Sequence, residues 1–252
     1  MGHSSWVWSV VFSPDGNYIA SASYDQTIKH WEVKSGKCLQ TWKAHTASVT
    51  AVAFSPDGNY LASSSFDQTI KLWSVSTREC IFTLLGHTNS VWAVAFSPDS
   101  QQLASGSFDQ TIRLWNIATG KCTHTLTGHT APVTSISYQL KQSFPTADNW
   151  QLLSGSFDQT IRQWNLVNGE CTQTLTGHTG IVYAIAVSAS IPKPIVFSGS
   201  FDETIKVWNL ETNNCLLSMR SPRPYEGMQI TDIKGLTLAQ TSTLKALGAV
   251  ES

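Results

Sequence analysis

The chain has 252 residues, of which 41% are hydrophobic and 13% charged, and its formal net charge is −1. This composition is that of a globular protein with a substantial core, and the balanced charge gives no attraction for nucleic acid or an anionic membrane. No apolar run reaches the roughly 18 residues that span a bilayer, and the start, MGHSSWVW, lacks the basic and apolar regions of a signal peptide. We therefore expect a cytoplasmic protein that binds neither nucleic acid nor membrane.

One nine-residue pattern recurs five times along the chain. Its copies are SYDQTIKHW (23–31), SFDQTIKLW (65–73), SFDQTIRLW (107–115), SFDQTIRQW (156–164) and SFDETIKVW (200–208). Successive aspartates, like successive tryptophans, are 42, 42, 49 and 44 residues apart. A period in the forties indicates a repeat array in which each unit buries its faces against its neighbours, so the function must be sought in the array.

Each unit predicts four short strands, which are clearest in the second unit. The first strand, over 49–54, is apolar on both sides and ends at the type I turn SPDG (55–58). Three more strands follow, over 60–65, 69–75 and 80–84. Four antiparallel strands in about 42 residues are typical of one blade of a β-propeller. The sequence thus predicts an all-β array of five blades, over about 1–43, 44–85, 86–127, 128–176 and 177–220.

The five cysteines occur once per repeat, each seven positions after the recurrent tryptophan: Cys38, Cys80, Cys122, Cys171 and Cys215. Equivalent positions lie about one repeat width apart, too far for the roughly 4.4–6.8 Å between Cα atoms that a disulfide requires. No CxxC pair is present, which disfavours a cysteine metal site. We expect reduced, buried thiols, no metal and no other cofactor.

The spacing of three residue types carries a family resemblance. A Gly-His pair, roughly 20 residues to the aspartate, and six more to the tryptophan resemble the WD40 repeat, over residues 2–220. Two departures are small. The Trp-Asp dipeptide of the family name is absent from every copy, and Ala44-His45 lacks the glycine. The resemblance implies a WD40 β-propeller.

The resemblance also implies a hydrogen-bond relay in each blade. The indole N–H meets a serine hydroxyl, the hydroxyl meets an imidazole, and an aspartate holds the imidazole; an orphaned partner would cost about 1–3 kcal/mol. Ser65 recurs on the same face as Ser63, and the analogy favours Ser63. The expected relay sets are His3, Ser21, Asp25, Trp31; His45, Ser63, Asp67, Trp73; His87, Ser105, Asp109, Trp115; His129, Ser154, Asp158, Trp164; and His178, Ser198, Asp202, Trp208.

The same residue types could form a hydrolase triad. Five identical active sites without a Gly-x-Ser-x-Gly elbow would be unusual for an enzyme, so we predict a structural relay and no catalytic residue.

Two segments depart from the repeat. The fourth unit carries an insertion, YQLKQSFPTADNW (138–150), whose Phe144 and Trp150 could anchor a partner, although a tolerated surface loop is the simpler interpretation. The tail, 221–252, contains a capping box at Thr237 and predicts a short helix near 237–247, ended by Gly248. This tail resembles the extension after WD40 arrays in large bacterial signalling ATPases of the NACHT and NB-ARC type, but the chain has no GxxxxGK[ST] loop.

The number of blades leaves three possibilities open. WD40 propellers usually have seven blades, so five could close into a ring, remain an open arc covered by the tail or a second copy, or belong to a longer chain; we favour the last. The predicted function is a non-catalytic protein-interaction scaffold, as the sensor part of a bacterial signalling protein. The alternative is a propeller that binds a small ligand or glycan, which requires equivalent pockets between blades.

Family analogy places three exposed side chains per blade on one rim: the third and fifth after the histidine, and the one before the aspartate. A partner surface made of these would be aromatic and uncharged. Packing of the recurrent Phe under its neighbour is the other interpretation of that position. The predicted partner-binding residues are Trp6, Trp8, Tyr24, Thr50, Phe66, Trp92, Phe108, Thr134, Phe157, Tyr183 and Phe201, with Ser48, Ser90, Pro132 and Ile181 completing the fifteen positions.

Overall fold

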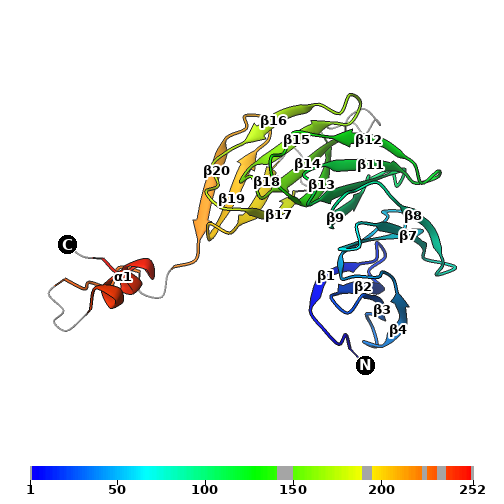
Figure 1. Ribbon diagram of the computed structural model, residues 1–252, viewed down its shortest axis with the longest axis horizontal. Coiled ribbons are helices and arrows are strands. Elements are labelled where there is room, and N and C mark those ends of the chain that lie inside the picture. The colour runs from blue at the N-terminus through cyan, green and yellow to red at the C-terminus, as the bar shows by residue number, and fades with distance from the viewer. Residues whose placement is uncertain (1, 141–149, 189–194, 223–225, 232–236, 251–252) are drawn as a thin grey trace. The chain divides into compact units, whose positions relative to one another are not determined.

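The computed structural model describes residues 2–140, 150–188, 195–222, 226–231 and 237–250. Its strands form five sheets of four, and each sheet is one repeat (Figure 1). Blade 1 contains β1 (Val7–Phe12), β2 (Tyr18–Ser23), β3 (Thr27–Glu32) and β4 (Cys38–Lys43). Blade 2 contains β5 (Val49–Phe54), β6 (Tyr60–Ser65), β7 (Ile70–Ser74) and β8 (Cys80–Leu84). Blade 3 contains β9 (Val91–Phe96), β10 (Gln102–Ser107), β11 (Ile112–Asn116) and β12 (Cys122–Leu126). Blade 4 contains β13 (Val133–Leu140), β14 (Trp150–Ser156), β15 (Ile161–Asn165) and β16 (Cys171–Leu175). Blade 5 contains β17 (Val182–Val187), β18 (Ile195–Ser200), β19 (Thr204–Asn209) and β20 (Cys215–Arg220).

Each blade is an antiparallel meander in which strands pair in chain order. The turn between the first two strands of blade 2 closes with a bond from the Gly58 N–H to the Ser55 carbonyl oxygen (2.9 Å), and Gly58 takes a φ of 75°. Glycine occupies this left-handed region without steric cost. The predicted all-β fold of five four-stranded blades is confirmed.

The tail forms a compact unit of its own. Contacts divide the chain into residues 1–218 and 219–252. In the second unit, α1 spans Leu238–Ala246, and Thr237 and Gln240 make the reciprocal bonds of a capping box. The predicted short helix is therefore confirmed. In the described part of this unit, Ile230 and Ala249 are buried.

Apolar side chains join successive blades within residues 1–218. The first strands of neighbouring blades pack together, β1 on β5, β5 on β9, β9 on β13 and β13 on β17. Between blades 1 and 2, Ala22 and Ile28 share a core cluster with Val49, Val52 and Trp73. We name the side of a blade that carries Val49 or its equivalent the valine face, and the side that carries Ile28 or its equivalent the isoleucine face. Each joint places the isoleucine face of one blade on the valine face of the next, as three further clusters show.

One histidine interrupts this apolar series. His30 is buried on the isoleucine face of blade 1, where blades 2 and 3 have Leu72 and Leu114. Its ring lies 4.8 Å from that of Tyr18 and 6.0 Å from that of Trp42, between centroids. Neither ring nitrogen has a hydrogen-bond partner among the described residues. Burial, and then the positive charge of Arg78, lower the pKa of His30.

We predict that His30→Leu stabilises the fold by about 1 kcal/mol at pH 7, because it removes an unpaired buried polar ring. The gain should grow as the pH falls below the ordinary histidine value of 6.5, since the unfolded chain then binds a proton that the folded chain disfavours. Urea unfolding at several pH values measures both effects. The reverse change, Leu114→His in blade 3, should destabilise, and a His30→Leu gain that does not vary with pH would contradict the account.

Candidate interaction surface and the relay beneath it

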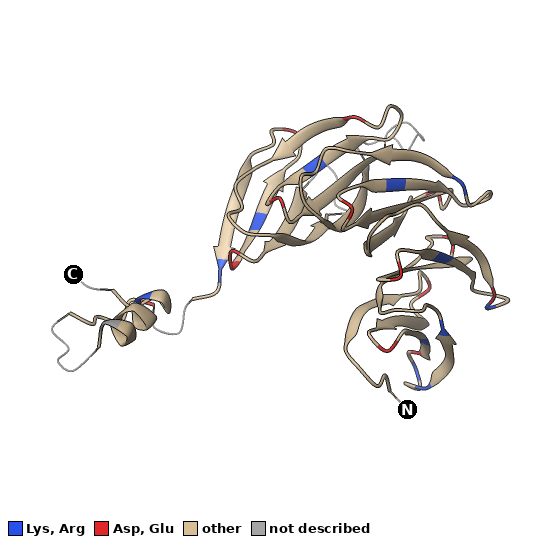
Figure 2. Ribbon diagram, in the orientation of Figure 1, with Lys and Arg blue, Asp and Glu red and all other residues tan. Residues whose placement is uncertain are grey.

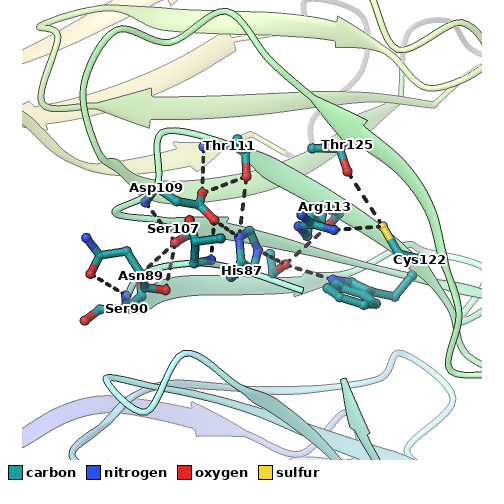
Figure 3. A network of polar contacts seen from close by, with 12 residues as sticks. His87, Asn89, Ser90, Ser107, Asp109, Thr111, Arg113, Cys122 and Thr125 are labelled. Carbon is teal, nitrogen blue, oxygen red and sulfur yellow. Dashed lines mark hydrogen bonds and ion pairs between the residues drawn. The ribbon is translucent and has the colours of Figure 1, made fainter. Parts of the chain in front are cut away.

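The histidine of blade 3 lies at the centre of a closed polar network (Figure 3). His87 Nδ1 is 2.7 Å from Asp109 Oδ2, and His87 Nε2 is 2.8 Å from Ser105 Oγ. The Trp115 indole N–H donates to the same serine oxygen at 2.8 Å. The Asp109 carboxylate also accepts bonds from the Thr88 amide (3.0 Å) and from the amide and hydroxyl of Thr111 (2.9 and 2.7 Å). The network therefore joins the second and third strands to the segment that enters the first.

The structure brings the corresponding side chains together in all five blades. Distances from His Nδ1 to the Asp oxygen are 2.7–2.9 Å, and those from His Nε2 to the Ser oxygen are 2.7–2.8 Å. The indole N–H lies 2.8–3.0 Å from the same serine oxygen. The four sets besides that of His87 are His3, Ser21, Asp25, Trp31; His45, Ser63, Asp67, Trp73; His129, Ser154, Asp158, Trp164; and His178, Ser198, Asp202, Trp208.

The choice between the two recurrent serines is settled by these contacts. Ser63 Oγ meets the histidine and the indole, whereas Ser65 Oγ donates to the Ala47 carbonyl oxygen (3.4 Å) and accepts from the Asp67 amide (3.0 Å). The five relay serines are buried. A catalytic serine must present its oxygen to a substrate, and here that oxygen is enclosed and accepts from an indole. The geometry therefore favours a structural role over acyl transfer.

The relay carboxylates are held in the charged form. For Asp109, burial by itself would raise the pKa, but hydrogen bonds from His87 and Thr111, attraction to His87 and the bond from the Thr88 amide outweigh burial. The pKa of Asp109 is therefore well below its ordinary 3.8. The pKa values of the other four relay aspartates are lowered as well.

We predict that Asp109→Ala destabilises the fold by about 2–4 kcal/mol, because it leaves buried donors without an acceptor. Asp25→Ala should cost less, since blade 1 is packed on one side only. Replacing the exposed Glu79 with alanine is the control and should change the stability by at most about 0.5 kcal/mol. Thermal melts that show Asp109→Ala to be as stable as wild type would contradict the structural role.

The charged form of these carboxylates should also make the stability of the fold depend on pH in acid. Because the folded pKa of Asp109 lies below that of the unfolded chain, the stability it contributes is present above about pH 4 and is lost as the pH falls further. Asp109→Asn keeps the side-chain shape without the charge, so its free energy of unfolding should fall less steeply than that of wild type between about pH 4 and 2. Equal slopes in urea titrations at these pH values would be the contrary result.

A continuous series of aromatic rings crosses all five blades, and we name it the aromatic belt. Its ring centroids are separated by 4.9 to 6.3 Å from one neighbour to the next. The members are Trp6, Trp8, Tyr24, Phe66, Trp92, Phe108, Phe157, Tyr183 and Phe201. These are all the aromatic residues among the fifteen rim positions, so the structure brings them together.

The belt is exposed at its ends and half-buried in its middle. The exposed fractions are 72% for Trp6, 43% for Trp8, 51% for Tyr24, 45% for Tyr183 and 73% for Phe201. Phe66, Trp92, Phe108 and Phe157 are half-buried, and Trp92 stacks on Phe108 at 4.9 Å. The recurrent phenylalanines of blades 2 to 4 therefore pack against neighbours as well as face solvent.

At two of the predicted partner-binding positions, the expected exposure of the side chain is wrong. Thr50 and Thr134 are buried, and each donates its hydroxyl to a carbonyl oxygen of the next blade, that of Val91 (2.6 Å) and that of Val182. Ser48 is buried too, whereas Ser90, Pro132 and Ile181 are half-buried. Thr50 and Thr134 both hold the fifth position after the histidine, where the residue varies from blade to blade. The variation is an alternation, Trp8, Thr50, Trp92, Thr134 and Tyr183, in which a small residue separates large ones.

In the first part of this series, the large residues on either side of the small one meet. Trp8 of blade 1 reaches Trp92 of blade 3, with 6.1 Å between ring centroids. Thr50 holds the equivalent position in blade 2, where its hydroxyl donates to the Val91 carbonyl oxygen, and a small residue at that position leaves room for the two rings to meet.

The fourth-blade insertion and the cysteines also differ from what the sequence predicts. The fourth-blade insertion lengthens its strands, because Leu140 of β13 pairs with Trp150 of β14. Trp150 is half-buried, and Phe144 lies outside the described residues.

The cysteines are free, but the expected burial of their thiols is wrong. Cys80, Cys122 and Cys215 are exposed, and Cys38 and Cys171 are half-buried. The fourth strand lies at the outer edge of each sheet, where the thiol meets solvent.

The described residues show neither a cluster of like charges along the strands nor a group of metal ligands. Figure 2 shows Lys and Arg scattered singly along the strands, with Asp and Glu mainly in turns. Among the described residues, no three His, Cys, Asp or Glu side chains are grouped to hold a metal ion. No helix in the described part is long and apolar enough to cross a membrane.

Comparison with known families agrees with the fold. Residues 6–117 match the family model of the IFT122 first β-propeller, and residues 120–165 and 169–209 match the WD domain, G-beta repeat. The chain is thus an array of β-propeller blades. It belongs to the WD40-repeat β-propeller proteins.

Individual relatives match about one repeat each. The eukaryotic translation initiation factor 3 subunit I of Pyricularia oryzae is 48% identical over 46 residues, 18% of this chain and 14% of that protein. The nuclear distribution protein nudF 1 of Talaromyces marneffei is 45% identical over 42 residues, 16% of this chain and 9% of that protein. Ribosome assembly protein 4 of Saccharomyces cerevisiae is 52% identical over 40 residues, 16% of this chain and 8% of that protein. The similarity therefore concerns the repeat unit, and these three relatives are eukaryotic.

Proposed function

We propose that the chain is a non-catalytic interaction scaffold and that the aromatic belt binds a protein partner. The belt supports this proposal because it is continuous across five blades, contains no charged residue, and exposes large parts of Trp6, Trp8 and Tyr24 at one end. Rigid aromatic side chains bury much area on binding and lose little conformational entropy, which makes them frequent hot spots of protein interfaces. The enclosed relay serines support a function without catalysis.

The finer proposal is that this scaffold is the sensor part of a bacterial signalling protein located in the cytoplasm. Its support is the resemblance of the tail to extensions that follow WD40 arrays in NACHT and NB-ARC ATPases. The relatives named above include a subunit of a translation initiation factor, which by its name works within a larger assembly. They support the scaffold more directly than the signalling context.

The glycan alternative has less support. It requires equivalent pockets between blades, and the joints of the array are filled by buried Val, Ile and Trp side chains. One depression among the described residues, of about 350 Å³, is lined by blade 5 alone and does not lie between two blades.

We predict that Trp6→Ala together with Trp8→Ala abolishes capture of protein partners in a lysate pull-down and leaves the melting temperature within a few degrees of wild type. Trp92 is left intact because it stacks within the belt and its loss would weaken the fold. The matched control is Val167→Ala, which removes an exposed apolar side chain outside the belt. Capture that survives the double change, or binding to free sugars on a glycan array instead of proteins, would overturn the proposal.

A further inference from the structure

The two ends of the array expose opposite halves of the same joint. On the valine face of blade 1, Val7 is 47% exposed and Val10 58%, whereas Val49, Val91, Val133 and Val182 are fully buried. On the isoleucine face of blade 5, Ile205 is 49% exposed, whereas its counterparts Ile28, Ile70, Ile112 and Ile161 are at most 1% exposed. Each face therefore lacks the neighbour that covers its equivalents inside the array.

A glycine on blade 5 marks a vacant position for a neighbour. The equivalent glycines of blades 3 and 4, Gly106 and Gly155, leave no room for a side chain, since an added Cβ would lie 2.7 Å from Val133 and 2.8 Å from Val182. At Gly199 the same addition would meet nothing within 4 Å. Beside the glycines of blades 3 and 4, a valine of the next blade fills this space. On blade 5 the space is open, and it lies in a depression that Gly199 lines together with Tyr183, Phe201 and Ile205.

The residues on the two sides of each joint are matched in size. Gly106 and Gly155 face joints whose valine side carries Ile136 and Ile185. Ala22 and Ser64 occupy the glycine position where the following blade carries the smaller Val52 and Val94. Blade 1 presents Val7 and Val10, which suit either glycine or alanine at position 199.

The aromatic belt offers a second contact at the same joint. Inside the array, the phenylalanine before the aspartate meets an aromatic ring of the next blade, as Phe66 meets Trp92 at 5.6 Å and Phe157 meets Tyr183 at 5.8 Å. Phe201 is 73% exposed and lacks such a ring from a following blade. Trp8 occupies in blade 1 the position that Trp92 and Tyr183 occupy in blades 3 and 5.

We propose that the isoleucine face of blade 5 binds the valine face of blade 1 of a second copy of this chain, so that copies associate head to tail. The two surfaces differ, so the contact is heterologous, and it uses a packing arrangement that the chain already makes four times. The proposal concerns the ends of the array and does not depend on the partner of the belt.

Light scattering on the full chain over a range of concentrations tests the proposal. The mass of wild type should rise above the 27.6 kDa of one chain, and Gly199→Ala should behave in the same way because Ala22 is accommodated in the first joint. Gly199→Leu should remain monomeric, with a melting temperature in dilute solution close to that of wild type, since an added Cβ at this position meets nothing within 4 Å in the single chain. Val10→Asp should also remain monomeric, because it places a charge on the other face.

Mixing the two blocked variants gives the sharpest test. Gly199→Leu keeps an intact valine face and Val10→Asp an intact isoleucine face, so the mixture should form a dimer of twice the single-chain mass and grow no further. The proposal would be overturned if the wild-type chain stays monomeric, because the tail or its own first blade would then cover blade 5. Assembly of Gly199→Leu alone or a mixture that fails to dimerise would also overturn it.

Discussion

A blade of this protein cannot bury its own faces, and that constraint organises the rest of the structure. A four-stranded sheet is too thin to enclose a core, so its apolar side chains are buried only when a second sheet lies against them. The four joints meet this need with one repeated contact between Ile28 or its equivalent and Val49 or its equivalent. Stability is therefore shared between neighbours, and the end blades, which have one neighbour each, are the weakest parts of the array.

The relay solves a different problem within each blade. The segment that enters a blade carries a histidine, and its imidazole, a serine hydroxyl and an indole must all be paired because they lie away from water. The Asp carboxylate completes the chain and also caps the amide and hydroxyl of Thr111 or its equivalent. Joints and relays together hold the rim in place, so that its aromatic side chains project from a rigid support. The rim can vary in sequence while the support is repeated.

Much of this could be predicted from the sequence because the repeat multiplies each signal by five. The strands of blade 2 were predicted over 60–65 and 80–84, and β6 and β8 have those bounds. The relay residues share one spacing, so a single resemblance placed all twenty. The predicted exposure of Thr50 and the predicted burial of the cysteines were both wrong, since burial depends on which blades meet across the rim and on which strand is outermost. Contacts such as that between Trp8 and Trp92 join alternate blades, and no local pattern encodes them directly.

Amide hydrogen exchange in dilute solution measures most directly whether blades are stabilised by their neighbours. We predict the slowest exchange in the inner strands of blade 3, such as β10, because this blade has neighbours on both sides. Exchange should be faster in β2 of blade 1 and β18 of blade 5, and intermediate in blades 2 and 4. Equal protection of β2, β10 and β18 would contradict the account, because it would mean that each blade, or the whole array, is stable without regard to its neighbours.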